Sequence, residues 1–158
     1  MAFDVEARLR ELGLELPHRP KPIANFLPFR VANGVAYLAG QTCERDGKVV
    51  YAGRVGEEID FETGQAAARI CALNLIASLR EACQGDLGRV GRCLRVGGFV
   101  QASAGYPRVP GVIDGASDLF VALWGDAGRH ARTAVGVATL PQNASVEVDA
   151  IFELRGPA

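Results

Sequence analysis

The chain has 158 residues, which is enough for one compact domain and too few for two of ordinary size. Hydrophobic residues make up 49% and charged residues 22%, proportions that are typical of a folded globular protein and exclude a disordered one. The formal net charge is -1, so the chain lacks the positive excess that binds nucleic-acid backbones, and we expect no nucleic-acid partner. Glycine is enriched, and its 19 residues follow no repeat, so they must lie within or between ordered elements.

Residues 1–24 are predicted to form an N-terminal helix and a proline-rich extension. Asp4 can cap a helix that ends at Gly13, and three prolines in residues 17–22 favour an extended connector. Residues 25–158 then form a single domain. No apolar run approaches the roughly 20 residues that span a bilayer, and the charged N-terminus resembles no secretion signal. We therefore expect a cytoplasmic protein that makes no membrane contact.

The domain begins with a predicted β-hairpin and a long helix. The apolar runs 29–31 and 35–40 flank Asn33-Gly34, a pair that favours the tight turn of a hairpin. A polar loop that contains several glycines is expected over residues 41–58. Asp60 can then cap a helix of roughly 24 residues, whose broad apolar stripe predicts that it lies across a sheet.

Three further strands and a second helix complete the predicted domain. Residues 92–103 form a strand, in which Gly97-Gly98 indicates either a bulge or a close backbone approach. A helix over 111–124 follows, and then the strands 131–140 and 144–154. The order ββαβαββ predicts an α+β fold with a mixed sheet and both helices on one face. The other face needs a cover, which an oligomer would supply.

Cysteine and histidine offer little chemistry in this sequence. The four cysteines lie too far apart for a zinc knuckle or a dithiol motif, so we expect buried thiols and no metal site. His18 lies in the proline connector and is predicted to be exposed. His130, at the start of a strand, would need an orienting carboxylate to act as a general base. The sequence identifies none, which favours a surface or interface role for His130.

Arg132 and Glu147 are the charged side chains whose positions could carry chemistry. Arg132 begins an otherwise apolar strand, where its planar guanidinium suits a carboxylate if it faces a cleft. It could equally be the partner of an internal acid such as Glu147. Glu147 lies in the middle of the last strand, where it could orient a water molecule or form part of a solvated face.

The hairpin and the C-terminal strands also carry a recognisable pattern. Residues 132–141 are Arg-Thr-Ala-Val-Gly-Val-Ala-Thr-Leu-Pro, residues 146–151 are Val-Glu-Val-Asp-Ala-Ile, and Ala39-Gly40-Gln41 ends the hairpin. These segments resemble the C-terminal signature and the Ser-Gly-Gln triplet of the Rid family, also called YjgF/YER057c/UK114. The resemblance runs from about Asn25 to Leu154 and is to a longer Rid-like subgroup that has an N-terminal extension.

The resemblance implies a chorismate-mutase-like fold and a homotrimer with clefts between its subunits. It also implies a deaminase, a hydrolase that converts small carboxylate-bearing enamines and 2-imino acids to 2-keto acids and ammonia, with no metal or organic cofactor. On this basis Arg132 clamps the substrate carboxylate, Glu147 positions the hydrolytic water, and Gly40 lets the backbone approach the ligand.

Five positions depart from the usual family pattern, and one of them is Gly136, which replaces a frequent glutamate. Phe26 falls where typical members carry tyrosine, Ala39 replaces a serine, and Ala134 replaces a frequent cysteine. Asp114 falls near a usual asparagine, and its negative charge would repel an anionic substrate if it faces the cleft. Two alternatives to the deaminase therefore stay open. One is a non-catalytic binder of small keto acids or related metabolites, and the other is an endoribonuclease, which the balanced charge disfavours.

Overall fold

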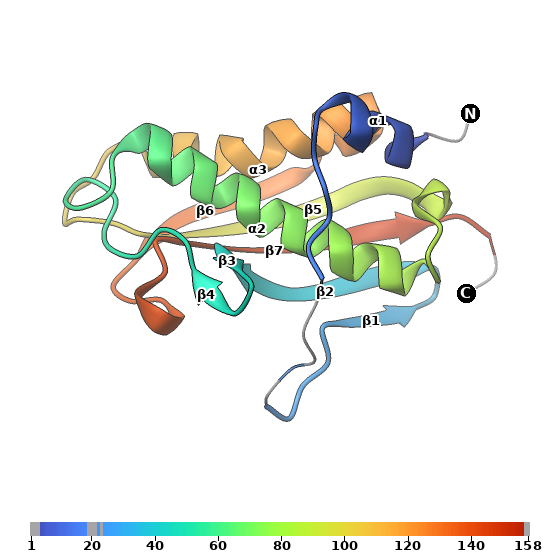
Figure 1. Cartoon of the computed structure of the whole chain (residues 1–158), viewed down its shortest axis with the longest axis horizontal. Helices are drawn as coiled ribbons and strands as arrows, with labels where there is room; N and C mark the ends of the chain where they lie inside the picture. Colours follow the sequence, from blue (N-terminus) through green and yellow to red (C-terminus); the bar gives the residue numbers. More distant parts are fainter. Residues whose placement is uncertain (1–3, 19–21, 23, 157–158) are drawn as a thin grey trace.

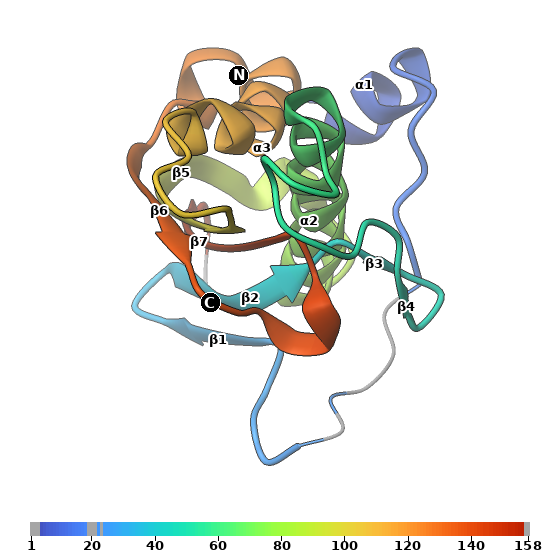
Figure 2. The ribbon, with the colours of Figure 1, turned by 90° about the vertical axis from the view of Figure 1, so that its left-hand side faces the viewer.

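The computed structural model describes residues 4–18, 22 and 24–156. Two long helices cover one face of a five-stranded sheet (Figure 1). A view turned by 90° shows the two helices side by side over the sheet, while no helix of the described part covers the opposite face (Figure 2). The predicted α+β fold with both helices on one face is therefore confirmed.

The sheet has the strand order β1-β2-β7-β5-β6. Neighbouring strands are antiparallel except β5 and β6, which are parallel because helix α3 connects them. Asn33 and Gly34 both have positive φ angles, of 51° and 73°, and form the predicted hairpin turn between β1 and β2. The strands are β1 (Phe29–Ala32), β2 (Val35–Thr42), β5 (Val90–Gln101), β6 (Ala131–Val137) and β7 (Val146–Leu154), with a separate hairpin of β3 (Glu44–Arg45) and β4 (Lys48–Val49).

The helices α2 (Phe61–Ala82) and α3 (Val109–Trp124) form the second layer. Asp60 caps α2 as predicted, since its carboxylate accepts a hydrogen bond of 2.8 Å from the Thr63 amide. In the core, Phe120 and Trp124 of α3 contact Phe152 of β7, with ring centroids 5.5 Å and 5.6 Å apart. The two layers thus share one apolar interior, which fixes α3 against the strands β5 to β7.

The short helix α1 (Val5–Glu11) packs onto the outer side of this helical layer. Val5 and Leu9 are buried among the core residues. Arg8 Nε donates to the Ala122 carbonyl of α3 at 3.1 Å, and Glu6 forms an ion pair of 3.2 Å with Arg80 of α2. The N-terminal helix therefore contributes to the same core as the domain.

Gly97-Gly98 is a place of close approach, and β5 has no bulge there. Both glycines stay in register with β7, and the pairing irregularities of β5 lie nearer its start. A Cβ atom on Gly98 would lie only 2.5 to 2.7 Å from three carbons of Ile113, so α3 packs directly on the strand backbone.

The four cysteines are free and buried, as the sequence predicts. Burial raises the pKa of Cys83 to about 11 and that of Cys93 to about 12, which leaves these thiols protonated and unreactive. Within residues 4–18, 22 and 24–156, no helix combines the length and apolar character needed to cross a membrane.

Candidate functional site

The structure separates the predicted site residues into two groups. Asp114, Arg132 and Ala134 lie where β6 meets α3 at the edge of the sheet, and we call them the edge group. Ala39, Gly40 and Glu147 lie on β2 and β7, on the sheet face that the helices leave open, and we call them the face group.

The edge group lies on the helix side of the sheet. Arg132 pairs with Val96, which is fully buried in the core, and paired residues of parallel strands point to the same face. Arg132 Nη1 donates to Asp114 Oδ1 at 2.7 Å and to Ser117 Oγ at 3.2 Å. The acid beside Arg132 is therefore Asp114 and not Glu147. The side chains of Arg132 and Asp114 remain 24% and 48% exposed, so the pair is open to solvent on one side.

Ser117 and His130 extend the edge group, whereas the sequence predicted only a surface or interface role for His130 and no role for Ser117. The His130 Nδ1 atom lies 2.7 Å from the Gly128 carbonyl, which can only accept, so Nδ1 carries the hydrogen. Nε2 then accepts from the Ser117 hydroxyl at 2.9 Å, and the Ser117 oxygen in turn accepts from Arg132. Burial lowers the pKa of His130, and the positive charge of Arg132 lowers it further, although the Gly128 carbonyl opposes both. His130 is thus neutral near pH 7.

The face group is built around a β-bulge. Leu38 pairs with Ala150 and Gln41 with Val148, so two residues, Ala39 and Gly40, lie opposite a single residue of β7. The Glu147 carboxylate lies directly over the Gly40 backbone, because a Cβ atom on Gly40 would collide with the Glu147 Oε1 atom. The bulge therefore makes room for an acid that a regular strand with a side chain would displace.

Glu147 has the environment of a proton-exchanging group. It lies on the open sheet face, since its neighbours Val146 and Val148 point into the core. Burial raises the pKa of Glu147, and the nearby carboxylate of Asp149 raises it further. This combination of a raised pKa and partial exposure is common in catalytic acids and bases, although structural carboxyl groups also show it.

Within one chain the two groups do not form a common cleft. Arg132 and Glu147 lie on strands that flank β5 from either side, opposite Val96 and Phe99 of that strand. Two strand spacings and an offset of three residues separate their Cα atoms by about 14 Å. The side chains also leave opposite faces of the sheet, so a ligand bound to one cannot reach the other in the same subunit.

Phe26 stands apart from both groups but close to the face group along the backbone. The Ala39 amide donates to the Pro28 carbonyl at 2.9 Å, which attaches the segment before β1 to the bulge. Phe26 is 56% exposed and Leu27 is 55% exposed, which is unusual for large apolar side chains. Figure 2 shows the segment that leads into β1 extending away from the two layers.

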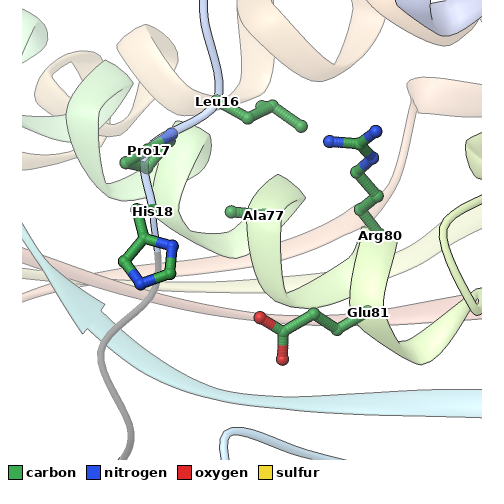
Figure 3. Close-up of a pocket in the computed structure, with 6 residues that line it drawn as sticks. All are labelled: Leu16, Pro17, His18, Ala77, Arg80 and Glu81. Atoms are coloured by element: carbon green, nitrogen blue, oxygen red, sulfur yellow. The ribbon is translucent and has the colours of Figure 1, made fainter.

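A separate surface groove lies beside the proline connector. Leu16, Pro17 and exposed His18 face Ala77, Arg80 and Glu81 of α2 across a volume of about 340 Å³ (Figure 3). Neither the edge group nor the face group lines this groove. Among the described residues, no three His, Cys, Asp or Glu side chains are placed to hold a metal ion.

Known proteins share this architecture along almost the whole chain. Residues 6–154 match the family model described as "YjgF/chorismate_mutase-like, putative endoribonuclease". Protein TCP17 of Trypanosoma cruzi is 40% identical over 152 residues, which are 96% of this chain and 94% of that protein. The crystal structure of Atu1372, a protein with unknown function from Agrobacterium tumefaciens, is 42% identical with a TM-score of 0.89, over 95% of this chain and 92% of the other. A "putative endoribonuclease" from Shewanella oneidensis is 34% identical with a TM-score of 0.91, over 95% and 99% of the two chains.

Proposed function

The chain belongs to the YjgF/chorismate mutase-like family, also called Rid, and we propose that it hydrolyses small carboxylate-bearing enamines and imines in clefts between the subunits of a homotrimer. The products are 2-keto acids and ammonia. One observation carries the proposal: Arg132 and Glu147 lie on opposite faces of one sheet, and both are partly exposed. A site that uses both side chains has to take them from two chains.

The open sheet face is suited to such an assembly. Tyr37 and Val135 are exposed by 48% and 41%, although both are largely apolar. Tyr37 pairs with Ile151, so the apolar surface crosses more than one strand. Association through this face removes it from water and leaves the edge group of one copy free to meet the face group of the next.

In the proposed reaction, Arg132 holds the substrate carboxylate. Asp114 and Ser117 occupy only Nη1, while Nε and Nη2 of Arg132 donate to no residue in the described part of the chain. These two nitrogens form a fork that matches the two oxygens of a carboxylate. Binding there fixes the imine carbon, and positioning contributes much of the acceleration because imines hydrolyse readily in water.

Glu147 of the adjacent subunit transfers the protons. An enamine first takes a proton from solvent on carbon and releases one from nitrogen to solvent, which converts it to the imine. The Glu147 carboxylate then takes a proton from water as the water oxygen bonds to the imine carbon, and the same proton passes to nitrogen. When the resulting carbinolamine collapses, its hydroxyl proton passes to nitrogen through the Glu147 carboxylate, and the C–N bond breaks. One water is consumed, and one 2-keto acid and one ammonia are released.

Three of the other predicted site residues bring no polar group to this chemistry. Phe26, Ala39 and Ala134 carry neither a hydroxyl nor a thiol, so proton transfer depends on Glu147. The alternative of a non-catalytic keto-acid binder uses the Arg132 fork in the same way and needs no proton transfer. Turnover therefore distinguishes the two functions.

The test measures 2-keto acid release from imino acids that an amino-acid oxidase generates in situ. We expect the protein to accelerate release, and we expect Arg132→Ala and Glu147→Gln each to reduce the acceleration about 100-fold. Arg129→Ala is the matched control, because the Arg129 side chain is exposed and, among the described residues, pairs only with Asp126. It should retain full activity.

Two results would contradict the hydrolase: no acceleration by the wild-type protein, or an Arg132→Ala variant that equals it. Calorimetric binding of a keto acid without turnover would support the binder instead. Cleavage of RNA that disappears with Arg132→Ala would support a nuclease, in line with the names of some relatives.

A further inference from the structure

Asp114 places a second charge beside the fork that receives the substrate carboxylate. Its Oδ1 atom accepts from Arg132 Nη1 at 2.7 Å, whereas Oδ2 accepts from no residue within the described part of the chain. The Asp114 side chain is 48% exposed, twice the fraction of Arg132. The solvent-facing side of the pair therefore presents a cationic fork and an anionic oxygen next to each other.

No further charge of the edge group disturbs this balance. Ser117 is neutral, and His130 is neutral near pH 7 because burial lowers its pKa. Arg132 and Asp114 thus contribute one positive and one negative charge, so the edge group offers no excess attraction for a dianion. A carboxylate-binding site without Asp114 would favour anions of any shape.

We propose that the edge group selects substrates that carry a cationic nitrogen in addition to their carboxylate, a proposal that rests on the proposed function. Arg132 Nε and Nη2 take the carboxylate, and Asp114 Oδ2 takes the side-chain ammonium or guanidinium. The substrate class is thus the imino acids derived from basic amino acids. Acidic imino acids are rejected, because a second carboxylate would face Asp114 without a counter-charge.

The hydrogen bonds from Ser117 and His130 support this assignment by fixing the pair. The Gly128 carbonyl orients His130, His130 orients the Ser117 hydroxyl, and Ser117 accepts from the same Arg132 nitrogen that Asp114 contacts. A guanidinium held at Nη1 by two partners keeps its other edge in one orientation. Preorganised groups of this kind discriminate between ligands better than flexible ones.

The experiment measures the binding of three 2-keto acids by titration calorimetry and, in parallel, the hydrolysis of the corresponding imino acids. The probes are 5-guanidino-2-oxopentanoate, 4-methyl-2-oxopentanoate and 2-oxoglutarate, whose side chains are cationic, neutral and anionic. Wild type is compared with Asp114→Asn. Asp118→Asn is the matched control, because Asp118 is exposed one turn along α3 and has no hydrogen bond or ion pair to the described residues. Thermal unfolding verifies that each variant folds.

We expect the wild-type protein to bind the guanidino acid about tenfold more tightly than the neutral acid, and 2-oxoglutarate most weakly. Asp114→Asn should bring the three affinities within about twofold of one another, and Asp118→Asn should keep the wild-type ranking.

A ranking of affinities that persists in Asp114→Asn, or equal affinities in the wild type, would overturn this inference without contradicting the proposed hydrolase activity. An equal loss for all three acids in Asp114→Asn would also overturn it, since Asp114 would then only brace Arg132. A charge ranking without turnover would support the subsite and overturn the hydrolase, and no binding or turnover by the wild type would overturn both.

Discussion

Replacing Gly40 with alanine tests the face group without removing a charged side chain. The backbone of Gly40 lies outside the left-handed region, so alanine can adopt it, but its methyl group would collide with Glu147 Oε1 and lie 3.2 Å from the Glu147 Cδ atom. The carboxylate must therefore turn away. Its displacement costs about 0.5–1.5 kcal/mol, whereas alanine stabilises by about 0.4–1 kcal/mol because it restricts the unfolded chain. The free energy of unfolding should thus change by less than about 1 kcal/mol.

Activity should respond far more strongly than stability. A displacement of about 1 Å in a catalytic group can reduce the rate about 100-fold, so we expect Gly40→Ala to release keto acid about 100-fold more slowly. Urea unfolding and the oxidase-coupled assay measure the two effects on the same sample. Gly136→Ala is the matched control, because a Cβ atom on this strand glycine meets Val109 at an ordinary 3.7 Å. It should leave the rate of keto-acid release unchanged and raise the free energy of unfolding by about 0.4–1 kcal/mol, because only the restriction of the unfolded chain remains.

The double variant gives the result that would refute this reasoning. If alanine acts only by moving Glu147, then Gly40→Ala should add nothing to the loss already caused by Glu147→Gln. A Gly40→Ala variant with full activity, or a double variant clearly slower than Glu147→Gln alone, would contradict the placement of Glu147 in the site.

Three further predictions concern stability. Glu147→Gln should be more stable than wild type at pH 7, and the difference in the free energy of unfolding should shrink as the pH falls towards the usual carboxyl pKa of 4.5. The reason is that a carboxyl group whose pKa is raised in the folded state loses stability as the pH rises. Urea midpoints across this pH range measure the difference, and a difference that does not vary with pH would contradict the prediction. Gly98→Ala should cost about 1–3 kcal/mol in the same assay, because its methyl group overlaps Ile113, and an unchanged midpoint would refute the close approach. Leu9→Ala should cost about 2–5 kcal/mol, since Leu9 is only 3% exposed, and a loss below about 0.5 kcal/mol would separate the N-terminal helix from the folding unit.

The elements of the fold were predictable because each carries a local signal. Asp60 caps α2, Asn33-Gly34 forms the hairpin turn, and the alternation along residues 146–154 separates the buried face of β7 from its open face. These signals depend on residues a few positions apart, so they can be recognised without knowledge of the tertiary structure.

The position of the bulge was not predictable in the same way. The paired glycines at 97 and 98 suggested a bulge or a close approach, whereas the bulge over Glu147 lies at Ala39-Gly40. It arises from the register between β2 and β7, which are distant in the chain. The register between such strands cannot be predicted from the residues near the bulge. Gly40 and Gly98 nevertheless explain part of the glycine enrichment, since at each a side chain would collide with a group from another element.

The sequence predicted the kind of partner that Arg132 has, but it did not identify the residue. An arginine in an apolar strand predicts a carboxylate partner or ligand, and the sequence offered Glu147 as that partner. The actual partner, Asp114, comes from α3 because β5 and β6 are parallel and α3 crosses between them. The contacts of Ser117 with His130 and Arg132 depend on the same crossing, so residue spacing alone could not reveal them.

Mixing two inactive variants tests most directly the claim that one site takes residues from two chains. Arg132→Ala keeps an intact face group, and Glu147→Gln keeps an intact edge group. In oligomers assembled from equal amounts of both, half of the edge groups and half of the face groups are intact, so about a quarter of the interfaces join two intact groups. We expect 2-keto acid release to recover to about a quarter of the wild-type rate. Mixed oligomers, verified by native mass spectrometry, that stay as inactive as either variant alone would contradict it.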